Sequence, residues 1–182
     1  GGCRFDIFTI SFLNFICPYI RKQLETVARV DVVWDVYIDN SLKAATRSKR
    51  GKGIRRRVQG QNKIPQNWQS FLRDDDNKKE LFSFLSQHLA QQHFAEKIVV
   101  ATNDQDVLCY PPRDDVLNLA PCSHEEADTR IMVHVSDAVN HGLKRVIIRT
   151  VDTDVAVIAV SLFREIGAFH AFTGCDTVSS FA

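Results

Sequence analysis

Residues 29–37 read Arg-Val-Asp-Val-Val-Trp-Asp-Val-Tyr, a β-branched and aromatic run that predicts a buried strand. Upstream, residues 7–27 have the apolar pattern of a core helix. Downstream, residues 97–101 and 106–110 predict two more strands, and residues 146–148 predict a short buried one. Strands separated by helical stretches are typical of an α/β protein.

Two further helices have clear start signals. Asn77 and Glu80 match a capping box, as do Ser123 and Glu126 at the start of a helix expected over residues 123–141. The order of elements predicts a Rossmann-like three-layer αβα fold with a mainly parallel sheet, whose ligands bind beyond the carboxyl ends of the strands.

Length and composition favour one soluble domain over residues 1–182. The chain has 182 residues, of which 45% are hydrophobic, enough for one core. The apolar run at residues 7–20 contains Pro18 and is shorter than the roughly 20 residues that span a bilayer, so no membrane association is expected. Five cysteines without a Cys-x-x-Cys motif predict neither a disulfide framework nor a zinc site, and favour an intracellular location.

The charge is distributed unevenly. Residues 1–60 hold 12 Lys/Arg against 5 Asp/Glu, whereas residues 61–182 hold 11 against 17. Of the 12 Lys/Arg in residues 1–60, eight lie in a loop expected at residues 40–60: Lys43, Arg47, Lys49, Arg50, Lys52, Arg55, Arg56 and Arg57. Such a run is either a solvated surface, a nuclear-localisation-like patch or a phosphate-binding segment. A nucleic acid held by the basic segment and cut at a metal-loaded acidic cluster would use both halves of the chain, and a nuclear location is expected.

Acidic residues recur where apolar segments begin or end: Asp35, Glu126, Asp128, Asp152, Asp154 and Asp176. Carboxylates gathered at strand ends repel one another unless a cation neutralises them, and Mg²⁺ or Mn²⁺ prefers oxygen ligands. A simpler interpretation remains open for two groups. Glu126 fits a capping box, and the pair Asp152 and Asp154 is also typical of a turn that caps the next helix.

These motifs resemble a known order of residues. Glu126-Ala127-Asp128, Asp152-Thr153-Asp154 and Gly174-Cys175-Asp176, preceded by Asp35 and the basic run, resemble the acidic motifs and basic arch of the flap-endonuclease branch of the PIN-like nucleases. The strings HEEADTR, VDTDV and TGCDTVSSF are also similar to uncharacterised animal proteins associated with mobile elements.

The resemblance implies a PIN-like nuclease with a basic arch at residues 40–60 and an acidic core at residues 97–182. It implies two Mg²⁺ or Mn²⁺ ions held by the six carboxylates, and phosphodiester hydrolysis by a metal-activated water. Lys43, Arg47 and Arg50 would stabilise the scissile phosphate. The expected substrate is DNA rather than RNA.

The chain also departs from that family. It has no convincing first-strand Asp, and only 21 residues separate Asp154 from Asp176, so we expect an incomplete domain. A non-catalytic module that binds nucleic acid or a protein therefore stays open as an alternative. A dehalogenase-type phosphatase is a weaker one, because its Asp-x-Asp motif opens the domain whereas here only 28 residues follow Asp154.

Overall fold

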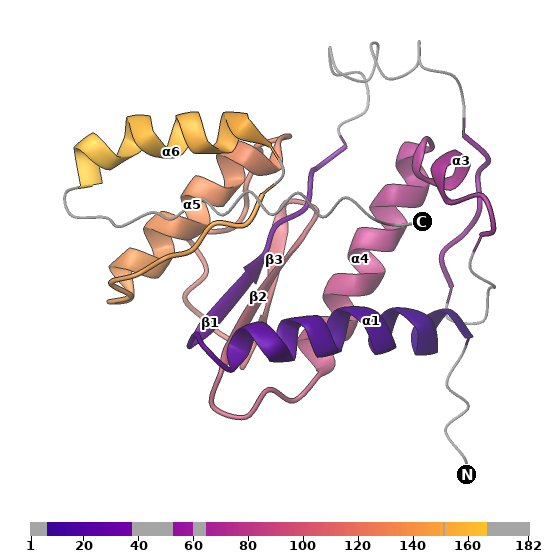
Figure 1. Ribbon diagram of the computed structural model, residues 1–182, viewed down its shortest axis with the longest axis horizontal. Coiled ribbons are helices and arrows are strands. Elements are labelled where there is room, and N and C mark those ends of the chain that lie inside the picture. The colour runs from indigo at the N-terminus through magenta and orange to yellow at the C-terminus, as the bar shows by residue number, and fades with distance from the viewer. Residues whose placement is uncertain (1–6, 38–52, 60–64, 151, 167–182) are drawn as a thin grey trace. The chain divides into compact units, whose positions relative to one another are not determined.

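The computed structural model describes residues 7–37, 53–59, 65–150 and 152–166, which belong to two compact units divided between Glu125 and Glu126 (Figure 1). The first unit contains α1 (Ile7–Leu24), β1 (Arg29–Val32), α3 (Trp68–Leu72), α4 (Asp75–Gln91), β2 (Ile98–Asn103) and β3 (Asp106–Tyr110). The second contains α5 (Ala127–Asn140) and α6 (Thr153–Ile166). A single domain over residues 1–182 stays a prediction.

The three described strands form a mixed sheet in the order β1-β2-β3. β1 pairs with β2 in parallel, with Val30 opposite Val99, and this confirms the α/β class. β3 pairs with β2 in the antiparallel sense, so the expectation of a mainly parallel sheet is wrong for this sheet. The reason is local: Asp104 adopts a φ of 55° in the turn after β2, and the chain reverses there instead of crossing over through a helix.

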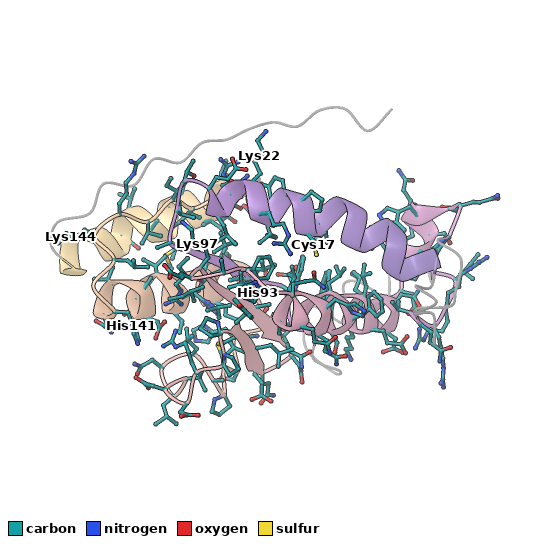
Figure 2. The ribbon with its side chains drawn as sticks, turned by 90° about the horizontal axis from the view of Figure 1, so that it is seen from below. Cys17, Lys22, His93, Lys97, His141 and Lys144 are labelled. Carbon is teal, nitrogen blue, oxygen red and sulfur yellow. The ribbon has the colours of Figure 1, made fainter. Side chains whose placement is uncertain are left out.

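Helices α1 and α4 pack on one face of this sheet. Alternate strand residues Val30, Val32, Val99 and Ala101 share a core with Cys17, Ile20 and Leu24 of α1 and with Leu89 of α4. Figure 2 shows Cys17 on the inner side of α1 and Lys22 pointing away from the body of the protein. None of the described helices is both long and apolar enough to cross a bilayer. The full three-layer arrangement stays a prediction.

β1 ends earlier than expected, at Val32, because Trp34 bonds to side chains instead of a strand partner. The Trp34 amide donates to Thr102 Oγ1 (2.9 Å), and its indole nitrogen donates to Ser86 Oγ (2.9 Å). The indole also stacks on Phe82 of α4, with ring centroids 4.7 Å apart. Residues 33–37 are therefore fixed against α4 and β2 without belonging to the strand.

The short strand expected at residues 146–148 is wrong: this stretch is not a strand in the second unit. Ile148 is buried and Val146 is partly buried in one core with residues of α5 and α6, whereas Ile147 between them is 43% exposed. Alternate side chains thus point inward, as in a strand. Through these inward-pointing side chains the stretch packs against α5 and α6. Residues 146–148 form no hydrogen-bonded pairing with a described strand.

The expected helix starts also need correction. The cap of α4 is Asp74, whose Oδ1 accepts from the Asn77 amide (3.0 Å), and Asn77 itself lies inside the helix. α5 starts at Ala127, so the Ser123 capping box does not form, and Glu126 occupies the cap position without a side-chain capping bond. A short helix, α3, precedes α4 and is capped by Asn67, whose side chain accepts from the Ser70 amide.

Residues 53–58, which we call the docked segment, lie along α3 and the start of α4. The Asn77 side chain is fully buried and bonds to this segment through both of its polar atoms. Its Oδ1 accepts from the Arg56 amide (2.8 Å) and from Arg55 Nη1 (2.9 Å), while its Nδ2 donates to the carbonyls of Ile54 (2.8 Å) and Phe71 (2.9 Å). All four bonding positions of the amide are used.

The docked segment begins at a position that only glycine fits. A Cβ on Gly53 would lie 2.5 Å from the Ser70 carbonyl oxygen and 2.6 Å from the Asp74 amide nitrogen. Both are backbone atoms at the α3–α4 junction, so neither can move aside cheaply. The missing side chain therefore allows the segment to approach the junction this closely.

We predict that Asn77→Ala destabilises the protein strongly. The change removes four hydrogen bonds and leaves buried backbone groups of the docked segment without partners, which corresponds to on the order of 3 kcal/mol in the free energy of unfolding. Urea unfolding followed by circular dichroism measures it. Gln87→Ala, at an exposed position of the same helix, should change stability by less than about 0.5 kcal/mol. Equal effects of the two changes would contradict the structural role of Asn77.

Candidate functional site

The acidic residues of the second unit lie at the starts of its two helices. Glu126 is the residue before α5, and Asp128 lies in the first turn, closer to the helix start than the sequence indicated. Asp128 Oδ1 accepts from the Thr129 amide at 2.7 Å. Carboxylates at these positions interact favourably with the positive end of the helix dipole, so they have a structural role whether or not they bind a metal ion.

Asp152 and Asp154 flank the first residue of α6. Asp152 Oδ1 accepts from the Asp154 amide at 2.9 Å, and the Asp152 amide donates to Thr150 Oγ1 at 3.0 Å. Both aspartates are exposed. Asp152 thus closes the start of α6 with one oxygen, as the simpler interpretation predicted. The other oxygen of Asp152 and the carboxylate of Asp154 lie on the solvent-exposed side.

The two acidic helix starts lie toward the same end of the second unit. Figure 1 shows the chain running out along α5, returning through residues 143–150 and running out again along α6. The two helices share one core, which includes Met132 and Val135 of α5 and Val155 and Ala159 of α6. Two carboxylate pairs that are 24 or more residues apart in the chain are therefore brought to one end of a helix pair.

The described residues do not assemble a complete metal site. Within the ranges that the structure describes, no three His, Cys, Asp or Glu side chains are grouped closely enough to hold an ion. Asp35 is exposed in the first unit, next to Val36, whose amide donates to the Glu125 carbonyl at 2.9 Å. Asp176, Lys43, Arg47 and Arg50 lie outside the described residues. The proposed ligand set stays a prediction.

The described end of the basic run is the docked segment, whose backbone and one arginine are hydrogen-bonded to side chains of α4. Arg55 contacts Glu80 through Nη2, and Glu80 Oε2 accepts from the Val58 amide at 2.8 Å. Val58 is buried in a core with Phe71, Leu81 and Leu85. The segment is thus fastened at both ends, while Arg56 and Arg57 stay exposed.

The Glu80 carboxylate interacts electrostatically with this segment. Burial by itself raises the pKa of Glu80, but hydrogen bonds from Arg55 and from the Val58 amide, together with the charges of Arg55 and Arg57, outweigh it. The pKa of Glu80 is therefore lower than that of an ordinary glutamate. The carboxylate form is the one that holds the segment.

Sequence reasoning did not identify Asn77 and Glu80 as the binding surface for the basic run. Their spacing of three residues was interpreted as a capping box, because the same spacing places two side chains on one helical face. No feature of residues 53–58 indicates that they lie along α4. The contact is long-range, and only the folded chain contains it.

We predict that the Glu80 contact makes stability depend on pH in the acidic range. Since the pKa of Glu80 is lower in the folded state, its contribution is fully present above the unfolded value of about 4.3 and is lost as the pH falls through the folded value. Glu80→Gln should therefore be less stable than the wild type near neutral pH, and this difference should shrink toward about pH 3.

Urea unfolding of both proteins across this pH range measures the difference. Glu96→Gln, which alters an exposed glutamate, is the matched control and should keep a constant difference from the wild type. A Glu80→Gln difference that does not vary with pH would show that the carboxylate charge is not what fastens the segment.

No protein-family model, curated protein or solved structure matches this chain. The resemblance to PIN-like nucleases accordingly stays a prediction, and the function is inferred from the residues and contacts of the chain itself.

Proposed function

We propose that this chain binds nucleic acid, with DNA as the expected ligand, through its basic run at residues 43–57. One observation carries the proposal: the described end of this run is held against α4, while Arg56 and Arg57 are exposed. A disordered cationic tail has to lose its conformational freedom on binding. A segment whose backbone is already fixed loses less, and so it binds more tightly for the same charge.

The residue types suit a phosphate backbone. Guanidinium groups donate two parallel hydrogen bonds to phosphate oxygens and stay charged at every physiological pH. Eight Lys and Arg residues fall within residues 43–57, enough for several phosphate contacts. Binding of this kind releases condensed counterions and weakens steeply with salt, whatever the base sequence.

Divalent-metal-dependent phosphodiester cleavage is the second candidate. It is supported by the two acidic helix starts at one end of the second unit, because carboxylate oxygens suit Mg²⁺ or Mn²⁺. Asp35, Glu126, Asp128, Asp152, Asp154 and Asp176 are the proposed ligands of one or two ions. A bound ion would supply an activated water for attack on phosphorus. Lys43, Arg47 and Arg50 are proposed to stabilise the charge that develops on the phosphate.

We predict salt-dependent binding of fluorescein-labelled DNA about 20 nucleotides long, in single-stranded and duplex forms. The logarithm of the association constant should fall linearly with that of the salt concentration, by about 0.7 per phosphate contact for single strands and about 0.9 for duplexes. Fluorescence anisotropy at several salt concentrations gives the slope. Replacing Lys43, Arg47 and Arg50 with Gln should lower the slope by about two to three units.

The control for this experiment removes the same number of charges elsewhere. Lys22, Lys144 and Arg145 are exposed and lie outside the basic run, and their replacement with Gln should leave the slope nearly unchanged. If the wild-type protein does not bind DNA even at about 50 mM salt, where such contacts are strong, the proposed function is wrong.

Cleavage is tested separately with Mn²⁺ and Mg²⁺ on flap, hairpin and single-stranded DNA. The double change Asp152→Asn and Asp154→Asn should abolish cleavage and leave binding intact, because Asn caps a helix about as well as Asp but is a much poorer ligand for these ions. Asp114→Asn with Asp115→Asn, at exposed positions outside the proposed ligand set, is the matched control. Absence of any metal-dependent cleavage by the wild type would leave a non-catalytic binding module.

A further inference from the structure

We propose that neighbouring arginines of the docked segment have different roles: Arg55 fastens the segment to α4, and Arg56 contacts a phosphate group of the bound nucleic acid. This inference rests on the proposed function and assigns residues to it. Composition alone treats Arg55, Arg56 and Arg57 as equivalent cations, whereas their contacts in the folded chain are different.

Arg55 is already engaged within the protein. Its Nη1 donates to Asn77 Oδ1 (2.9 Å) and to the Arg56 carbonyl (3.0 Å), and its Nη2 donates to the Glu80 carboxylate. The Asp76 carboxylate lies 4.0 Å from its Nε. To bind a phosphate, Arg55 would have to give up contacts that hold the segment in place. Its charge is also balanced by the Glu80 carboxylate, so it attracts an additional anion weakly.

Arg56 combines a fixed backbone with an available side chain. Its amide donates to the buried Asn77 side chain (2.8 Å), and its carbonyl accepts from Arg55. The residue is exposed, and within the part of the chain that the structure describes its guanidinium makes no hydrogen bond or ion pair. Its five N–H donors are therefore open to an incoming anion.

The backbone pattern explains why the two neighbours differ. The amides of Ile54, Arg56 and Val58 donate respectively to the Ser70 carbonyl (3.3 Å), to Asn77 Oδ1 (2.8 Å) and to Glu80 Oε2 (2.8 Å). When every second amide points to the same side, the backbone is extended and successive side chains point in opposite directions. The side chain of Arg56 therefore leaves the segment on the side opposite to that of Arg55.

The electrostatics of Glu80 agree with this alternation. The positive charges that lower the pKa of Glu80 belong to Arg55 and Arg57, the residues on either side of Arg56. Arg55 and Arg57 thus lie on the Glu80 side of the segment. We assign the phosphate contact to Arg56 alone of the three, and expect Arg57 to have at most a secondary part.

The test compares Arg56→Gln with the double change Arg55→Gln and Glu80→Gln. The double change removes the structural pair without altering the net charge. We expect Arg56→Gln to weaken DNA binding on the order of tenfold and to lower the salt slope by about 0.7 for single strands or 0.9 for duplexes, with the melting temperature unchanged. The double change should lower the melting temperature and leave the salt slope unchanged.

Two further variants complete the test. Arg56→Lys keeps the charge and should restore the wild-type slope, and Arg57→Gln should change the slope less than Arg56→Gln does. The assignment is overturned if Arg56→Gln leaves the slope intact, or if loss of the Arg55–Glu80 pair lowers it by as much. Failure of the wild type to bind DNA is a different result, since it removes the proposed function itself.

Discussion

The Asn77 side chain satisfies a constraint on which the arrangement of the first unit depends. Residues 53–58 run close to α3 and α4 without a strand beside them, so their backbone groups need partners that no sheet supplies. Asn77 supplies an acceptor and a donor to the segment from a position with no exposed surface, and Glu80 supplies another acceptor one helical turn later. Together with the close approach at Gly53, these contacts convert part of a cationic run into fixed structure.

This fixed structure changes how the charge of the segment is used. A run of arginines in a flexible loop presents an average charge, whereas an extended and docked run presents alternate side chains on opposite sides. One side is occupied by Glu80 and its partners, which hold the segment, and the other side is available for an anion. Under the proposed function, the same residue type would serve stability at Arg55 and phosphate recognition at Arg56.

In the second unit, helix capping uses carboxylates that are also the proposed ligands of a metal ion. Asp152 Oδ1 accepts from the Asp154 amide at the start of α6, and Asp128 Oδ1 accepts from the amide of its neighbour Thr129. These contacts explain why acidic residues occur at the two helix starts without reference to any ion. The two carboxylate pairs lie toward one end of the helix pair, because the chain returns through residues 143–150 before α6 begins (Figure 1).

The sequence predicted the elements well where the pattern was long. The helix at the N-terminus, the strands β1, β2 and β3, and helices α4 and α5 were all expected close to where they lie. The wrong predictions concern which residues a segment contacts in the folded chain, and not the periodicity of the segment itself. The burial of residues 146–148 alternates as in a strand, but Ile148 packs against α5 and α6 and the stretch does not pair with a described strand. Asn77 and Glu80 have the spacing of a capping box, but their side chains bind the docked segment.

The sequence by itself determined the α/β class, the position of the basic run and the order of the acidic residues, because these follow from local composition and periodicity. Only the tertiary structure decided that β3 pairs in the antiparallel sense, that residues 53–58 dock on α4, and that Arg55 is the arginine that donates to Glu80. The antiparallel pairing of β3 follows from the chain reversal at Asp104, whereas the backbone-amide contacts that dock residues 53–58 on α4 join residues 21 or 22 positions apart. Their free energy depends on backbone groups finding partners across that distance, and no local pattern encodes it.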